Sequence, residues 1–225
     1  MCANFKPIIP TQVRAMGLAP IQFEYEEDIY PCASGAPLLF QTTEGQWQWR
    51  QVMFGLVPKW AEDLKIARHT YNARYETIFS KPSFKDAANH FQFGVVPVDQ
   101  FYETKIVDGK AQRWAVKRKD AKPIFIAALY QIARVENQIV RSCALLTMTA
   151  NDHPIMNQFH SYKDEKRSVI VIPEEKLGQW LAHKRVNLQE FVQGFPVSEF
   201  ECFYAPRIKT EKEMQASLSP QQHLF

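Results

Sequence analysis

Short runs of apolar and β-branched residues constrain the fold of this chain most strongly. Three of them read "PIFIAALY" (123–130), "CALLTMTA" (143–150) and "RSVIVIP" (167–173). Each has the length of a strand rather than of a helix, and consecutive apolar positions are typical of strands buried on both faces. A further segment, "GQWQWRQVMFGLVPKW", alternates Trp47 and Trp49 with polar residues before an apolar run. It predicts a strand that leads into a proline-bounded turn.

Two segments are predicted to form short helices. In "KPSFKDAANHF", we expect Ser83 to cap a helix, because its side chain can accept a hydrogen bond from the first turn. In "PEEKLGQWLAH", Pro173 precedes two glutamates, which are favourable at the positive end of a helix. Strands dominate, and they do not alternate regularly with helices. We therefore predict an α+β fold: a single domain with a mostly antiparallel, curved or barrel-like β-sheet core and a few peripheral helices.

The chain of 225 residues is long enough to bury a core, and 46% of its residues are hydrophobic. No repeat or linker divides it, and the sequence becomes polar after residue 208. We expect one domain over residues 1–208 and a flexible tail over residues 209–225. No apolar run is long enough to span a bilayer and the start lacks the layout of a signal peptide, so we expect a cytoplasmic location without membrane association.

The four cysteines lie far apart, at positions 2, 32, 143 and 202. None has the spacing of zinc ligands, so we expect no metal and no other cofactor, and in a reducing cytoplasm the thiols would stay free. Cys2 differs from the others because removal of Met1 would make it the amino terminus. Its thiol and α-amine would then be two nucleophiles attached to one carbon.

Two other segments contain polar residues that could form a site with Cys2. In "YNARYETI", Asn72, Arg74 and Glu76 occupy alternate positions and would share one face of a strand, although the polar face of an edge strand would look the same. Glu103 in "FYET" directly follows two aromatic residues. Aromatic walls would partly desolvate its carboxylate and suit it to acid–base work. A surface glutamate at a strand end is the simpler alternative.

Two histidines are candidates for proton transfer. His160 follows the segment "LLTMTAN" by a short connection, and His153 lies in the same loop. Histidine as a residue type exchanges protons near neutral pH, which suits acid–base catalysis. A single histidine is more often structural than catalytic, so the residues alone leave both roles open.

The segments named above occur in a defined order along the chain. They are "MC", "FGLVPKWA", "YNARYETI" with "KPSF", "VVPVDQFYE", "FIAALY" and "ALLTMTAN", followed by a histidine. In this order they resemble the SOS-response-associated peptidase (SRAP) family, proteins that shield abasic sites in single-stranded DNA. The resemblance extends from Met1 to about Trp180 and Leu181, which is most of the chain. It implies an SRAP-like fold.

The resemblance also implies a chemistry. After removal of Met1, the amine and thiol of Cys2 would condense with the aldehyde of an abasic deoxyribose and form a thiazolidine, which is a covalent DNA–protein crosslink. Asn72 matches the asparagine that positions the amine. Glu103 matches the carboxylate that acts as acid and base at the sugar, and also during the removal of Met1 that frees Cys2. His160 matches the histidine that moves protons during imine formation.

DNA binding is implied mainly by the resemblance, in which Arg74 matches an arginine that holds a phosphate. The net charge is only +3, but basic residues between Lys59 and Lys85 alternate with aromatic ones, as in proteins that bind single strands. A solvated face beside core aromatics is the alternative. The candidate DNA contacts are Arg74, Lys81, Phe54, Trp60 and Arg167.

The sequence departs from the family pattern near the expected site. Ala3 and Asn4 stand where the family has glycine and arginine, which removes one expected phosphate contact. Phe54 stands in place of a tryptophan. After His160 the family continues with Asp-Arg-Met-Pro, whereas this chain has "HSYKDEKRSVIVIP", in which Arg167 is the candidate substitute for the basic residue.

The chain ends in "QQHLF". Gln221, Leu224 and Phe225 are spaced as in the pentapeptide by which bacterial replication proteins dock on the sliding clamp. The alternative is an ordinary frayed terminus, and the clamp is therefore one candidate partner beside DNA.

Three functions are compatible with these features. The first is a monomeric abasic site processing protein that crosslinks to single-stranded DNA through Cys2 and has SRAP-type self-processing activity. The second is an N-terminal-nucleophile cysteine amidohydrolase, in which the Cys2 thiol attacks an amide and its own amine is the base. The third is a non-catalytic module that binds single-stranded DNA or the sliding clamp.

Overall fold

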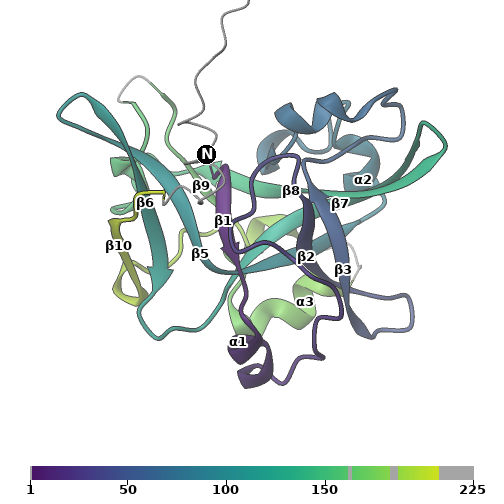
Figure 1. The fold of residues 1–225 in the computed structure, drawn as a ribbon, viewed down its shortest axis with the longest axis horizontal. Coiled ribbons are helices and arrows are strands. Elements are labelled where there is room, and N and C mark those ends of the chain that lie inside the picture. Colours follow the sequence, from purple (N-terminus) through teal and green to yellow (C-terminus); the bar gives the residue numbers. More distant parts are fainter. Residues whose placement is uncertain (1, 162–163, 183–186, 208–225) are drawn as a thin grey trace, which may run out of the picture.

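A closed ring of five strands forms the centre of the molecule. The computed structural model describes residues 2–161, 164–182 and 187–207. The strands of the ring are β2 (Ser34–Gln41), β3 (Trp47–Phe54), β5 (Phe93–Val107), β7 (Ile124–Val135) and β8 (Gln138–Thr149). They pair in the order β5-β2-β3-β8-β7, and β7 returns to β5 (Figure 1). Only the β3–β8 pairing in this ring is parallel, so the predicted antiparallel, barrel-like core is confirmed.

Five further strands extend the ring into a ten-stranded sheet. They are β1 (Asn4–Pro7), β4 (Asn72–Arg74), β6 (Lys110–Arg118), β9 (Arg167–Val169) and β10 (Phe200–Tyr204). β1 and β6 pair with the second half of β5, and β10 pairs with β6. β4 and β9 pair with β8. The long strands β5 and β8 therefore connect the ring to the strands that carry the polar candidates.

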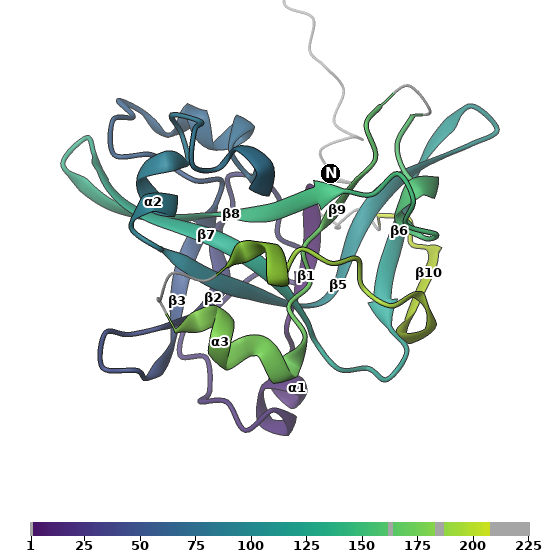
Figure 2. The same cartoon turned by 180° about the vertical axis from the view of Figure 1, so that it is seen from behind.

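The consecutive apolar positions in the strands reflect burial on both faces. Val96 and Val98 of β5 belong to an apolar cluster with members from all five ring strands, so this cluster fills the ring. Phe93 and Val95 belong to a second cluster on the outer face, together with residues of α2 (Lys85–Asn89) and α3 (Leu177–Leu181). α3 lies over the sheet (Figure 2). The indole N–H of its Trp180 donates a hydrogen bond of 2.8 Å to the Gly94 carbonyl of β5, which holds the helix there.

The remaining helices are short. They are α1 (Pro10–Ala15) and the 3₁₀ helices η1 (Leu64–His69), η2 (Tyr75–Thr77), η3 (Met156–Gln158), η4 (Glu174–Lys176), η5 (Leu188–Glu190) and η6 (Val197–Glu199). None of the described helices is long and apolar enough to cross a membrane.

The two predicted helices form, but one prediction about their ends is wrong. Phe84, not Ser83, occupies the cap position of α2, and no side chain caps this helix. Ser83 is not needed there, because the Lys81 carbonyl already accepts hydrogen bonds from the N–H groups of Phe84 and Lys85. The segment after Pro173 begins with η4 and continues into α3, as its glutamates predicted.

The predicted shared face of Asn72, Arg74 and Glu76 is also wrong in part. β4 ends at Arg74, and Glu76 lies in η2. β4 pairs with β8 from Leu145 to Thr147, and β9 pairs with β8 from Thr147 onward along the opposite edge, since Thr147 faces both Arg74 and Val169. After Arg74 the chain leaves the sheet and enters η2, where Glu76 pairs with Arg167 of β9.

Two predictions fall outside the described residues. The tail over residues 209–225 lies there, and so do the clamp-motif residues Gln221, Leu224 and Phe225. The domain boundary at residue 208 and the clamp interaction therefore stay predictions.

Candidate active site around Cys2

Cys2 is carried into the site by β1. This strand runs antiparallel to β5 with Asn4 opposite Tyr102, so two residues earlier the chain reaches the level of Glu103 and Thr104. The Cys2 side chain is fully buried, and its thiol lies 3.4 Å from the Asn4 carbonyl, to which it donates. Sheet pairing, rather than a flexible terminus, thus fixes the position of Cys2.

Asn72 holds the main chain of Cys2. Its Nδ2 donates a hydrogen bond of 2.8 Å to the Cys2 carbonyl oxygen, which joins two residues that lie 70 positions apart. Its Oδ1 is buried and finds no hydrogen-bond partner within the described residues. A buried acceptor without a partner is costly, so this oxygen is poised to accept a donor.

Glu103 and His160 form the charged part of the site. His160 Nε2 lies 2.8 Å from Glu103 Oε2, and the Glu103 side chain is only 1% exposed against 18% for His160. The backbone N–H of His160 donates a hydrogen bond of 2.7 Å to the Thr104 carbonyl. The backbone of His160 has a φ of 61°, which turns the chain at that point. The loop is therefore anchored to the same strand that carries Glu103.

Burial and the nearby Glu103 carboxylate raise the pKa of the Cys2 thiol to about 12. The Tyr71 pKa is also raised, first by burial and then by Cys2 and Glu103, so this phenol faces the same site. The Tyr71 ring packs edge-on against Phe54 at 5.7 Å, and Phe54 packs against Phe5 at 5.1 Å. These rings form an apolar wall, and they keep the thiol protonated at neutral pH.

This burial predicts an order of thiol reactivity. At about pH 8, iodoacetamide should modify the partly exposed Cys32 and Cys202 well before Cys2 and Cys143, because the thiolate is the reactive form. Burial raises the pKa of Cys143 to about 12 as well. Peptide mapping by mass spectrometry at several reaction times measures the order, and denaturation should abolish it. Rapid modification of Cys2 in the folded, Met1-containing protein would contradict the buried position.

The two arginines predicted to contact DNA differ in their surroundings. Arg74 is half-exposed, and its Nη1 lies 2.9 Å from Glu165 Oε2. Arg167 is buried; it pairs with Glu76 and Glu165 at 2.9 Å each and donates to the Thr147 carbonyl. The guanidinium of Arg167 is thus engaged inside the protein and does not face solvent as a DNA contact would.

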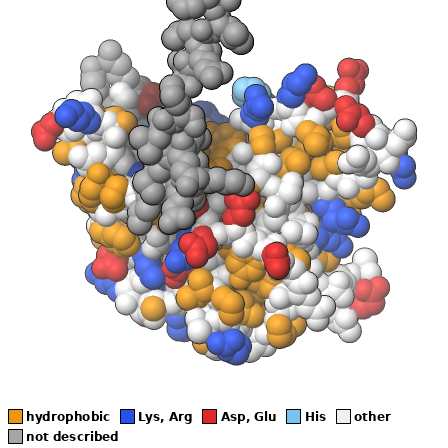
Figure 3. All heavy atoms as spheres, viewed as in Figure 1, with side chains coloured by type: hydrophobic (Ala, Val, Ile, Leu, Met, Phe, Trp, Pro, Cys, Tyr) orange, Lys and Arg blue, Asp and Glu red, His pale blue; other side chains and the backbone are white. Residues whose placement is uncertain are grey.

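The other predicted DNA contacts also differ in their exposure to solvent. Phe54 is fully buried in the wall beside Cys2 and offers no exposed ring for stacking. Trp60 is 57% exposed, and its indole N–H donates to the Pro82 carbonyl, while Lys81 is exposed. Lys59 forms an ion pair with Asp86, so the basic stretch is partly neutralised. Figure 3 shows basic and acidic side chains side by side at the upper right, where Figure 1 places α2.

His153, the competing histidine, lies in a separate environment. Its Nδ1 accepts from the N–H groups of Ile155 and Met156, so Nε2 carries the proton that binds the Phe195 carbonyl at 3.1 Å. Burial lowers its pKa, which keeps the ring neutral. His153 therefore closes a turn, whereas His160 lies in the site.

Sequence reasoning missed a polar contact beside Cys2. The Asn4 side chain accepts hydrogen bonds from Arg113 Nε and Nη2, and Arg113 also pairs with Asp28 at 2.8 Å. Asn4 lies 109 residues and Asp28 lies 85 residues from Arg113 in the sequence, so no local pattern links them. Glu165, which bridges Arg74 and Arg167, was also missed: it lies two residues from Arg167, but its partner Arg74 is far away in the sequence.

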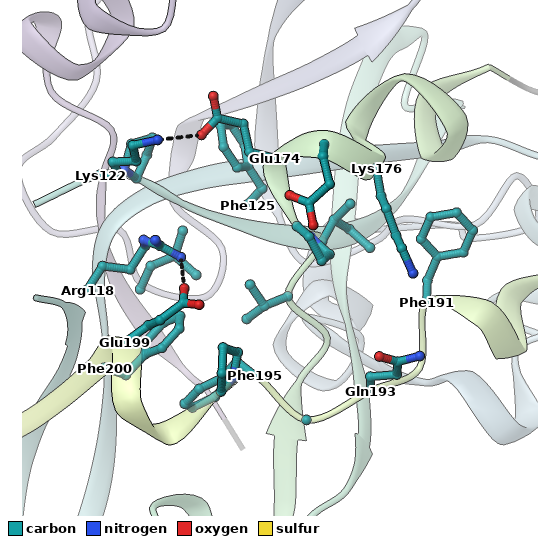
Figure 4. A pocket seen from close by; sticks show the side chains of 18 of the residues that line it. Arg118, Lys122, Phe125, Glu174, Lys176, Phe191, Gln193, Phe195, Glu199 and Phe200 are labelled. Atoms are coloured by element: carbon teal, nitrogen blue, oxygen red, sulfur yellow. Dashed lines mark hydrogen bonds and ion pairs between the residues drawn. The ribbon is translucent and has the colours of Figure 1, made fainter. Parts of the chain in front are cut away.

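A cavity of about 280 Å³ opens beside His160. Its lining residues are Arg74, His160, Asp164, Glu165 and Arg167. Another cavity, of about 370 Å³, lies apart from the site, and its rim contains the ion pairs Arg118–Glu199 and Lys122–Glu174 (Figure 4). No group of three or more His, Cys, Asp or Glu residues in the described ranges could hold a metal ion.

Comparison with known proteins identifies the family. The family model "SOS response associated peptidase (SRAP)" matches residues 7–208. The Abasic site processing protein YoqW of Bacillus subtilis is 28% identical over 158 residues, which cover 68% of this chain and 67% of YoqW. The Abasic site processing protein YobE of the same organism is 25% identical over 169 residues, or 73% of this chain and 74% of YobE.

Solved structures show the same fold. A protein from Bordetella bronchiseptica superposes with a TM-score of 0.84 at 24% identity and covers 92% of this chain and 100% of its own. A protein from Bacteroides thetaiotaomicron superposes with a TM-score of 0.73 at 13% identity, over 90% and 91% of the two chains. The resemblance found in the ordered sequence segments is confirmed, and the chain belongs to the SOS response associated peptidase (SRAP) family.

Proposed function

We propose that this protein processes abasic sites in single-stranded DNA by forming a covalent thiazolidine crosslink through Cys2. One observation supports this most directly: Asn72 donates a hydrogen bond of 2.8 Å to the Cys2 carbonyl oxygen, beside the Glu103–His160 pair. A 1,2-aminothiol next to an acid–base pair is suited to capture an aldehyde. The related proteins YoqW and YobE are named for abasic site processing.

The first step is removal of Met1, since an amide nitrogen cannot attack an aldehyde. Hydrolysis of the Met1–Cys2 bond consumes one water and leaves a free α-amine on Cys2. The buried Asn72 Oδ1 can accept a hydrogen bond from this amine while Nδ2 keeps the Cys2 carbonyl in place. Glu103, or an aminopeptidase of the cell, serves this hydrolysis.

The second step joins protein and DNA. The amine of Cys2 attacks the aldehyde carbon of the ring-opened sugar, and the resulting carbinolamine loses water when it receives a proton from the His160–Glu103 pair. The thiol then adds to the imine carbon, and its proton passes to the nitrogen with Glu103 as the relay. One carbon–nitrogen and one carbon–sulfur bond form, and one water leaves.

The raised thiol pKa favours this mechanism over an amidohydrolase. An N-terminal cysteine hydrolase needs the thiolate as its first nucleophile, whereas burial and the Glu103 charge disfavour the thiolate here. In the crosslinking mechanism the amine attacks first, and the thiol can deliver its proton as it closes the ring. A non-catalytic module would have no use for Asn72, Glu103 and His160 around a single cysteine.

We propose that Arg74, Lys81 and Trp60 contact the DNA strand, because their side chains are exposed and supply charge and a stacking surface. The proposed setting is the cytoplasm, where free thiols persist. The clamp interaction of the tail is a separate proposal, and binding of a peptide with the last residues to a purified clamp tests it.

The function is tested with an oligonucleotide that carries one abasic site. Purified protein whose Met1 is absent by intact mass should give a slow-migrating band on a denaturing gel. An undamaged oligonucleotide of the same sequence should give none. Release of product from small amides would favour the hydrolase, and DNA retention without a covalent band would favour the non-catalytic module.

A further inference from the structure

Glu165 lies between two guanidinium groups at the rim of the cavity that contains His160. Its Oε2 is 2.9 Å from Arg74 Nη1, and its Oε1 is 2.9 Å from Arg167 Nη1. The same residue lines the cavity of about 280 Å³ together with His160. A carboxylate that bridges two guanidinium groups occupies a place that suits the oxygens of a phosphate.

Only one half of this bridge can open without disturbing the fold. Arg167 is buried, and Glu76 holds it through two parallel contacts of 3.0 and 2.9 Å, while the Thr147 carbonyl accepts a third hydrogen bond. Arg74 and Glu165 are both well exposed, with 51% and 36% of their side chains accessible. Exposed pairs are weak, so the Arg74–Glu165 contact can exchange for another anion.

We propose that Glu165 is an internal competitor for the phosphate that Arg74 binds, and that it thereby sets the affinity for undamaged strands. The inference rests on the proposed function, since it takes Arg74 as a phosphate contact. A DNA phosphate must displace the Glu165 carboxylate. Arg74 then exchanges one anion for another, so this contact adds little to the binding free energy of the strand. An undamaged strand then dissociates readily. A strand with an abasic site is retained by the covalent bond to Cys2.

The charge of the cavity agrees with this role. Asp164 and Glu165 place two carboxylates at the entrance of a site whose proposed ligand is a polyanion. A surface that served only to bind DNA tightly would present unpaired cations. The carboxylates instead weaken the attraction where the strand would pass from Arg74 toward His160.

The test replaces Glu165 in the full-length protein. Glu165→Gln keeps the shape of the side chain and removes its charge, and it should raise the affinity for an undamaged single-stranded oligonucleotide about three- to fivefold. The slope of log affinity against log salt should steepen by up to about 0.7, as for one more phosphate contact on a single strand. Fluorescence anisotropy at several salt concentrations measures both quantities.

Two further variants distinguish the Arg74–Glu165 contact from the general effect of a negative charge in the cavity. Asp164→Asn is the matched control, because Asp164 lines the same cavity but forms no ion pair with a described residue. It should raise affinity clearly less than Glu165→Gln does. In an Arg74→Ala background, Glu165→Gln should raise affinity no more than Asp164→Asn does, because only the general effect of one negative charge is then left. Thermal melting confirms that each variant is folded.

Equal gains from Glu165→Gln and Asp164→Asn, or a Glu165→Gln gain that is as large without Arg74 as with it, would overturn the inference. These results are independent of the crosslink, because the oligonucleotide carries no abasic site. A protein that crosslinks to abasic DNA but shows no Glu165 effect would disprove the competitor alone. A Glu165 effect without any crosslink would disprove the proposed function instead.

Discussion

Replacement of Cys2 by alanine should abolish every adduct with abasic DNA that survives denaturation. The variant still offers an α-amine after removal of Met1, so it can form an imine with the sugar aldehyde. Without the thiol this imine cannot close to a ring, and hydrolysis returns the free aldehyde. The expected result is a complete loss of the covalent band, except when borohydride reduces the imine before denaturation.

Cys202→Ala is the matched control for this experiment. Cys202 is a free, partly exposed cysteine on β10, remote in the sheet from β1, which leads to Cys2. Its removal should leave the band at the intensity of the unaltered protein. A stable band from Cys2→Ala without borohydride would show that the thiol is not needed and would contradict the mechanism. Intact mass must show that Met1 is absent from each protein compared.

Replacement of Glu103 by glutamine is expected to slow crosslinking about a hundredfold, within the range that a positioned acid–base group contributes. Glutamine keeps the shape of the side chain but can neither take nor supply the proton that imine formation and ring closure require. It also removes the anion that holds His160 at 2.8 Å. The first-order rate of band formation at saturating DNA measures the effect.

Glu136→Gln, at the exposed turn between β7 and β8, controls for the loss of one negative charge. It should crosslink at the rate of the unaltered protein. Glu103→Gln should bind undamaged DNA normally, because Glu103 is buried and lies away from the proposed strand contacts. A normal crosslinking rate in this variant would remove Glu103 from the mechanism.

The strands could be predicted from sequence, but the way they close could not. Consecutive apolar residues such as those at positions 124–130 identify a strand with two buried faces, whatever its neighbours are. The parallel pairing of β3 with β8 depends on packing between segments about 90 residues apart, and no local pattern encodes it. The wrong cap at Ser83 follows from the turn at the Lys81 carbonyl, and the early end of β4 accompanies the pairing of Glu76 with the distant Arg167.

The candidate site was predictable only as separate polar positions. The residue types suggested proton transfer at Glu103 and His160, and the resemblance to a family linked them to Cys2 and Asn72. The structure brings the four residues together through β1, β4, β5 and the loop anchored at Thr104. The burial of Arg167 was not predictable, because Glu76, its main partner, lies 91 residues away.

The proposed function requires that the amine and the thiol of Cys2 together capture the aldehyde of an abasic site. The most direct measurement is the intact mass of the purified adduct. The expected mass is that of the chain without Met1 plus that of the abasic oligonucleotide, less one water, with no gain of hydrogen after borohydride. An adduct that retains Met1, or one that takes up two hydrogens as an open imine would, contradicts this mechanism.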